Sequence, residues 1–119
     1  MPDKAWKKFE RRVARFFGGK RNALSGRNSG AAMADVVHPR LTIECKQRKS
    51  HAVLRTWDQC AKEAKQEGEG KVPVVALSEA HRPGFWLVVY SGDLEQVATE
   101  AAIAHQRLRI ANLRPGSEE

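Results

Sequence analysis

The 119-residue sequence has few cysteines and no long apolar segment. Its two cysteines, Cys45 and Cys60, do not have the spacing of a zinc site. No apolar run approaches the roughly 20 residues that a membrane helix needs, and the first residues, "MPDKAWKKFERR", lack the uncharged core of a secretory signal. These absences argue against a zinc protein, a membrane partner and an exported protein with disulfides. We therefore expect a protein of the reducing cytoplasm.

Acidic residues are scarce in the first quarter of the chain. Between residues 4 and 28 there is a single acid, Glu10, among many lysines and arginines. Over the whole chain Lys and Arg number 21 against 14 Asp and Glu, a formal net charge of +7. A block of one sign on a basic domain favours a polyanionic partner, above all nucleic acid. The alternative is a basic protein that simply uses its charge for solubility.

Hydrophobic spacing and turn residues predict the element order α-β-β-α-β-β-α. Asp3 can cap the first helix, which Gly18-Gly19 end, and Thr56 to Gln59 fit a capping box that opens the second helix. The expected helices span about 3–17, 56–66 and 93–108, and the expected strands span about 34–38, 41–47, 72–78 and 85–90.

This order predicts an α/β fold with a mixed central β-sheet flanked by helices. The strand over 41–47, the following helix and the strand over 72–78 would form a right-handed parallel crossover. We expect a single domain over residues 1–111 and a flexible tail over 112–119. The segment "FWLVVY", residues 85–90, is apolar on both faces and is predicted to be buried. Since so small a chain has few helices to cover it, a second subunit could pair with it.

The segment "ADVVHPRLTIECKQRKS", residues 34–50, carries acids inside two apolar strands. Strand alternation places Glu44 and Lys46 on one face, and a hairpin about Pro39 brings Asp35 opposite position 43 or 44. Two carboxylates that close repel each other unless a cation lies between them, and Mg²⁺ suits such ligands. Lys46 could then stabilise charge on a phosphate or orient a water. The alternative is a solvated hairpin face with a Glu–Lys pair.

Glu10 lies on the apolar stripe of the first predicted helix, close to Trp6, Val13 and Phe17 at helical spacing. A carboxylate on that stripe is costly unless it is paired or bound to a metal. It either reaches the site in the hairpin or forms a salt bridge with Lys7 or an arginine.

Together these elements resemble the PD-(D/E)XK nuclease superfamily, and within it the archaeal-type Holliday junction resolvases. One departure is Ala34, which stands where the superfamily commonly has a proline. The residues that carry the resemblance are Glu10-Arg11 in the first helix, Arg21 with Ser25-Gly26 or Ser29-Gly30 in the basic loop, Asp35, and Glu44 with Lys46.

The resemblance implies a restriction-endonuclease-like fold and a structure-selective endonuclease that uses Mg²⁺, with Mn²⁺ able to substitute. The substrate would be a four-way DNA junction, cut by a homodimer in the cytoplasm of a prokaryote or of a virus-infected host. The implied catalytic residues are Glu10, Asp35, Glu44 and Lys46. The implied metal ligands are Asp35, Glu44, Glu10 and the backbone carbonyl of Cys45. A nuclease acting on duplex or flap DNA in repair or restriction, or an inactive DNA-binding module, are the alternatives.

Contacts with DNA are expected from basic and hydroxyl side chains near this site. Gln59 resembles a glutamine that some members add to the site, although the capping box explains it equally well. The expected DNA-binding residues are Arg11, Lys20, Arg21, Ser25, Arg27, Ser29, Arg48 and Lys49.

Overall fold

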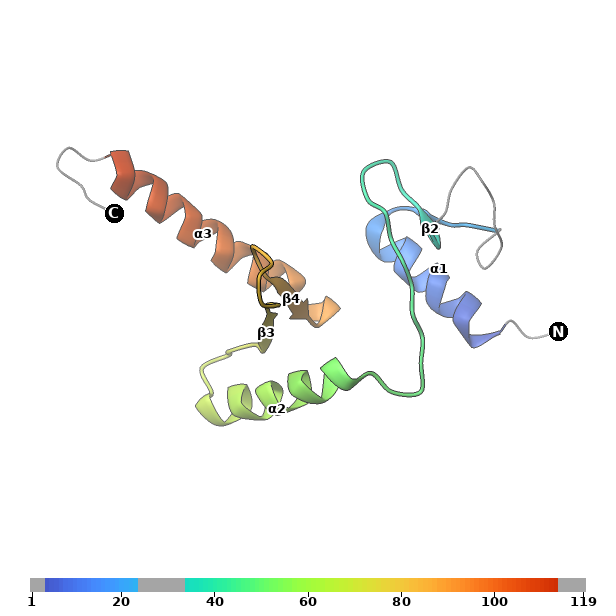
Figure 1. Ribbon diagram of the computed structural model, residues 1–119, viewed down its shortest axis with the longest axis horizontal. Helices are drawn as coiled ribbons and strands as arrows, with labels where there is room; N and C mark the ends of the chain where they lie inside the picture. The colour runs from blue at the N-terminus through green and yellow to red at the C-terminus, as the bar shows by residue number, and fades with distance from the viewer. Residues whose placement is uncertain (1–3, 24–33, 114–119) are drawn as a thin grey trace. The chain divides into compact units, whose positions relative to one another are not determined.

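The computed structural model describes residues 4–23 and 34–113, which form a mixed α/β structure with three helices and two small antiparallel sheets (Figure 1). The chain divides into two compact units, Met1–Lys49 and Ser50–Glu119. In chain order the elements are α1 (Ala5–Phe17), β1 (Lys20–Arg21), β2 (Val36–Val37), α2 (Ala52–Glu67), β3 (Val74–Leu77), β4 (Trp86–Val89), the 3₁₀ helix η1 (Ser91–Asp93) and α3 (Leu94–Leu113).

Helix α1 confirms the helix predicted from apolar spacing in the first unit. It buries Ala14 and, among its charged residues, Glu10. Gly18 ends it with φ 69°, in the left-handed conformation that glycine adopts without strain. The Gly18 and Gly19 N–H groups donate to the last helical carbonyls at 3.3 and 2.8 Å. The predicted cap, Asp3, lies outside the described residues.

The sheet of the first unit pairs β1, which lies in a segment predicted to be a loop, with β2, which lies within the strand predicted over 34–38. Arg21 lies opposite Val36 in an antiparallel register. The chain can approach this closely because residue 19 is glycine: a Cβ there would lie 2.6 Å from the Val37 carbonyl oxygen. Val36 is 1% exposed and forms the centre of this small core.

The predicted hairpin about Pro39 is present, but its strands are shorter than expected. The His38 Nδ1 accepts hydrogen bonds from the N–H groups of Arg40 and Leu41 at 3.0 and 3.1 Å, which closes the turn. Beyond it, an isolated antiparallel bridge joins Val36 to Ile43 in place of the strand predicted over 41–47. Val36 therefore has a partner on each side, β1 and Ile43.

In the second unit, α2 begins at Ala52, so the predicted start at Thr56 is wrong. The capping box lies inside the helix, and the residue at the N-cap, His51, makes no side-chain cap hydrogen bond. The partly covered positions 53, 57, 60, 61 and 64 form one helical stripe that starts before Thr56. Packing along this stripe, rather than the local capping signal, decides where the helix starts. Gly68 ends it with φ 74°, and its N–H donates to Ala64.

Strands β3 and β4 form an antiparallel hairpin in which Val74 lies opposite Val89. The prediction that residues 85–90 are buried on both faces is wrong, since Trp86 and Leu87 are 47% and 53% exposed, and the buried residue of the hairpin is Val75 on β3. A two-stranded sheet has too few neighbours to cover two apolar faces. After η1, helix α3 runs to Leu113, past the predicted end at residue 108, because no helix breaker occurs before Pro115.

The strand pairs among the described residues are antiparallel and lie in two separate sheets. The parallel crossover between 41–47 and 72–78 is not among them, so the central mixed sheet and the restriction-endonuclease-like order are not confirmed. The single domain over 1–111 stays a prediction, and residues after Leu113 lie outside the described part. Among the described helices, none has the length and apolar character needed to cross a membrane.

Candidate active site

Glu10 forms a buried ion pair with Arg21. The Arg21 Nε donates to the Glu10 Oε1 at 2.8 Å, and the side chains are 17% and 6% exposed. The turn at Gly18 and Gly19 brings β1 back beside α1, which places Arg21 there. The Arg21 guanidinium also lies over the Trp6 ring, 5.3 Å from its centre. An arginine was one of the partners proposed for Glu10, and its charge keeps a carboxylate tolerable in a buried position.

Asp35 lies where the hairpin predicts, across from residue 43. Its N–H donates to the Ile43 carbonyl oxygen at 3.0 Å. Its carboxylate accepts from the Cys45 N–H, with 2.6 Å between Oδ2 and N. Asp35 is therefore fixed through both main chain and side chain to the segment that carries Glu44.

Glu44 and Lys46 share a face, as strand alternation predicts. The Lys46 Nζ lies 3.8 Å from the Glu44 Oε2, and the side chains are 65% and 57% exposed. A pair this exposed contributes little to stability. Its position at the surface leaves the ammonium within reach of a bound polyanion.

The pKa of the Cys45 thiol is raised by burial and by the three acids near it. Burial, and after it the negative charges of Asp35, Glu10 and Glu44 in that order, together raise the pKa of Cys45 from 9.0 to about 11. The structure therefore places all three predicted carboxylates near enough for their charges to act on the Cys45 thiol. It also keeps the thiol protonated at neutral pH, which disfavours a thiolate nucleophile.

The donor set suits a hard cation, although it is not a closed cage. In residues 4–23 and 34–113, no three His, Cys, Asp or Glu side chains converge closely enough to hold a metal ion. Mg²⁺ needs fewer protein ligands, since it is commonly held by one or two carboxylates with waters and phosphate oxygens. The carboxylates of Asp35 and Glu44 and the Cys45 carbonyl are oxygen donors of this kind, so the residues present fit Mg²⁺ or Mn²⁺.

The predicted DNA contacts divide into three groups. Arg11, Lys20, Arg48 and Lys49 are exposed on the first unit. Arg21 is half-buried against Glu10 and Trp6 rather than extended into solvent. Ser25, Arg27 and Ser29, with both candidate Ser-Gly pairs, lie outside the described residues.

Gln59 lies on α2 in the second unit and is exposed. Because the helix begins at Ala52, the capping role is wrong. Its support of the site stays a prediction.

Asn22 is a buried polar residue that sequence reasoning missed. It is 9% exposed; its Nδ2 donates to the Ala34 carbonyl oxygen at 3.0 Å, and its N–H donates to the Asp35 carbonyl oxygen at 2.9 Å. No periodicity signals it, because its burial arises from pairing with a distant segment. The only local sequence feature that could have indicated its burial is its position directly after Arg21.

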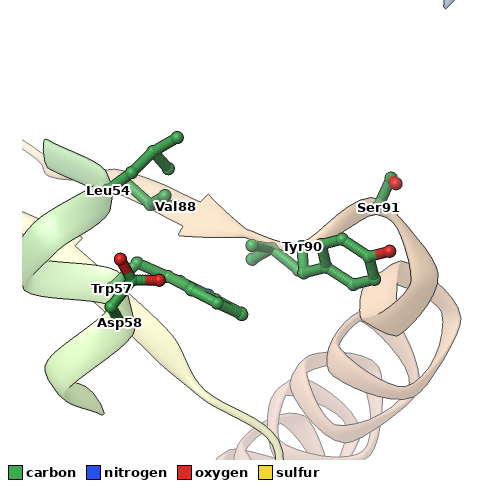
Figure 2. Close-up of a pocket in the computed structure, with 7 residues that line it drawn as sticks. Leu54, Trp57, Asp58, Val88, Tyr90 and Ser91 are labelled. Carbon is green, nitrogen blue, oxygen red and sulfur yellow. The ribbon is translucent and has the colours of Figure 1, made fainter. Parts of the chain in front are cut away.

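The second unit has a hollow of about 270 Å³ between α2 and the end of β4 (Figure 2). Trp57 points toward Tyr90, with ring centres 6.0 Å apart. The Trp57 Nε1 is buried and has no hydrogen-bond partner among the described residues. Apolar side chains line most of the hollow, and Asp58 and Ser91 add polar groups.

Comparison with known proteins finds no matching family model, no matching curated protein and no matching solved structure.

Proposed function

We propose that this protein is a metal-dependent, structure-selective endodeoxyribonuclease of the PD-(D/E)XK type. Its substrate would be a four-way DNA junction, in which it hydrolyses phosphodiester bonds as a Holliday junction resolvase. The observation that carries the proposal is the hydrogen bond that fixes the Asp35 carboxylate to the Cys45 N–H, between Glu44 and Lys46, which lie 3.8 Å apart. Glu10 is also near enough for its charge to act on the Cys45 thiol. A cluster of acids on a chain of net charge +7 suits a divalent ion that faces a phosphate backbone.

Each residue of the cluster has a distinct role in this proposal. Asp35, Glu44 and the Cys45 carbonyl hold Mg²⁺ or Mn²⁺, and Glu10 supports a second ion or a bound water. The ion supplies Lewis-acid stabilisation of the phosphate and a more acidic bound water. Lys46 presents its ammonium to the scissile phosphate or to the attacking water.

Lys46 is suited to that role because it is exposed and only loosely paired with Glu44, at 3.8 Å. Asp35 is suited to a fixed role because the Cys45 N–H holds its carboxylate at 2.6 Å. The site thus combines a fixed acid with an exposed cation. Preorganised ligands and a positionable ammonium are what hydrolysis of a charged diester needs.

Exposed cations around the acids would bind the DNA backbone. Arg11, Lys20, Arg48 and Lys49 are exposed, and contacts of this kind position DNA without reading its sequence. A four-way junction is approximately two-fold symmetric and needs two cuts, so a C₂ homodimer would present two equivalent sites. The restriction-endonuclease-like sheet and a cytoplasmic location belong to the same proposal.

A cleavage panel tests the proposal. The full chain is incubated with labelled four-way junction, flap, duplex and single-stranded DNA, with Mg²⁺, Mn²⁺ or EDTA, and Glu44→Gln is the matched variant. We expect metal-dependent cutting of the junction by the wild type and none by the variant. Preferential cutting of duplex or flap would favour another nuclease of the superfamily. Junction binding without cleavage under either metal would identify an inactive DNA-binding module.

A further inference from the structure

We infer that Arg21 and Asn22 form a clip that positions the acids of the site, with Arg21 orienting the Glu10 carboxylate and Asn22 holding the backbone around Asp35. The inference rests on the proposed nuclease function, which it extends by adding two positioning residues. It also changes the expected role of Arg21, from a contact with DNA phosphate to a support of Glu10.

The first half of the clip is the contact of Arg21 with two residues of α1. The Trp6 ring lies on one side of the Arg21 guanidinium at 5.3 Å, and the Glu10 Oε1 accepts from its Nε at 2.8 Å. Because the Arg21 side chain is only 17% exposed, most of it is engaged inside the protein. A phosphate contact needs the cationic group at the surface, and the neighbouring Lys20 is exposed in that way.

The second half of the clip is formed by hydrogen bonds from Asn22 to the segment that leads into β2. Asn22 reaches two consecutive carbonyl oxygens, Ala34 through Nδ2 at 3.0 Å and Asp35 through its N–H at 2.9 Å. On the other side, Asp35 is bonded to Ile43 and Cys45. The position of the Asp35 carboxylate therefore depends on Asn22 on one flank and on the hairpin on the other.

Since Arg21 and Asn22 are adjacent, one short segment couples α1 to β2. A shift of this segment would move Glu10 and Asp35 relative to each other. A misplacement of about 1 Å in a catalytic group costs on the order of 100-fold in rate. Loss of a residue that orients a metal ligand typically costs about 10–100-fold in metal affinity or activity.

Matched variants of residues 20–22 test the inference with a readout other than cleavage. Mn²⁺ affinity of the DNA-free protein is measured by electron paramagnetic resonance for Arg21→Gln, Asn22→Asp and Lys20→Gln. Asn22→Asp preserves shape but turns the donor to Ala34 into an acceptor. We expect Mn²⁺ affinity to fall about 10-fold or more in the first two variants and to stay at the wild-type level in Lys20→Gln.

The salt dependence of junction binding separates the two roles of a cation. Lys20→Gln should lower the slope of log K against log salt by about one, whereas Arg21→Gln should leave it unchanged. Arg21→Lys, which keeps a charge for Glu10, should recover part of the Mn²⁺ affinity. In a protein that already carries Glu10→Gln, adding Arg21→Gln should lower the Mn²⁺ affinity little further, because Arg21 acts through Glu10.

Thermal melting shows which variants are folded at the assay temperature. If Arg21→Gln is unfolded there, the Mn²⁺ affinity and salt slope of Arg21→Lys are compared with the wild type instead. A lower salt slope with wild-type Mn²⁺ affinity in Arg21→Gln would overturn its half of the clip, and wild-type Mn²⁺ affinity in Asn22→Asp would overturn the other. If the wild type binds Mn²⁺ and cleaves while the variants match it, only the clip fails. A wild type that neither binds Mn²⁺ nor cleaves would overturn the proposed function as well.

Discussion

The Asp35 carboxylate accepts a hydrogen bond from the Cys45 N–H, with 2.6 Å between Oδ2 and N. This contact joins the two sides of the hairpin at the point where the acids gather. Cys45 lies between Glu44 and Lys46 in the sequence, so fixing its main chain also fixes where those two side chains begin. The hydrogen bond is thus both a structural tie and a determinant of the site.

Replacing Asp35 should separate these two roles. Asp35→Ala leaves the Cys45 N–H without its acceptor and should lower the free energy of unfolding by about 1–3 kcal/mol. Asp35→Asn retains an oxygen acceptor and should cost less stability. Both variants should lose at least about 100-fold in cleavage rate, because the charge that holds the metal is gone.

Urea unfolding and single-turnover cleavage measure the two effects on the same preparations. Asp35→Asn that cleaves at the wild-type rate would show that the Asp35 charge is not part of the chemistry. Equal stability of the Ala and Asn variants would show that the hydrogen bond to Cys45 contributes little.

The raised pKa of Cys45 predicts slow alkylation at neutral pH. Burial first, and then Asp35, Glu10 and Glu44, raise the pKa of the thiol from 9.0 to about 11, so the reactive thiolate is rare until the pH approaches that value. The folded protein holds this proton more tightly than the unfolded chain does. The contribution of Cys45 to stability is therefore intact below about pH 9 and declines as the pH rises to about 11.

Iodoacetamide labelling followed by mass spectrometry of the Cys45 peptide measures this titration. The labelling rate should rise steadily with pH up to about 11 and should rise at lower pH in Glu44→Gln, which removes one of the three charges. Unfolded protein in urea supplies the reference rate. A labelling rate that levels off near pH 9 in the folded protein would contradict the predicted environment.

Lys46→Ala should strongly reduce the cleavage rate while sparing metal binding. The ammonium is 65% exposed and lies 3.8 Å from Glu44, so its loss should change the free energy of unfolding by less than about 1 kcal/mol. If it stabilises the phosphate or orients the water, the rate should fall about 100- to 1000-fold. Mn²⁺ affinity and single-turnover cleavage give the comparison, with Glu44→Gln as the variant that should lose both. Retained cleavage would remove the role assigned to Lys46.

The local sequence pattern was sufficient to predict much of the structure of the first unit. Apolar spacing and Gly18 define α1, and His38 and Pro39 lie in the turn that brings Asp35 opposite Ile43. The same reasoning predicts that Glu44 and Lys46 share a face. These features depend on residues close in sequence, which is why a single sequence reveals them.

Features that depend on distant partners were not predictable in the same way. Lys20 and Arg21 have no strand pattern, and they form β1 only because Gly19 allows the chain to approach Val37. Asn22 looks like an ordinary turn residue until its bonds to Ala34 and Asp35 are known. A strong local signal can also mislead, as the capping box inside α2 shows. The missing information in each case is tertiary packing, which overrides local preference.

The basic segment after the site should contribute to DNA binding through charge alone. Arg48 and Lys49 are exposed and directly follow the segment that carries Glu44 and Lys46. Each contact with a phosphate releases about 0.9 counterion, so Arg48→Gln and Lys49→Gln should each lower the salt slope by about one. Lys71→Gln is the matched control, because that lysine lies in the second unit and is paired with Glu67 at 2.9 Å.

Fluorescence anisotropy with a labelled junction, repeated over a range of salt concentrations, measures these slopes. The two site-proximal variants should weaken binding most at low salt, and by the same factor for junctions of different sequence, since phosphate contacts read no bases. Lys71→Gln should have the same salt slope as the wild type. Slopes that do not distinguish Arg48→Gln or Lys49→Gln from Lys71→Gln would place the DNA path away from this segment, and the acids around Cys45 would then need another route to a scissile phosphate.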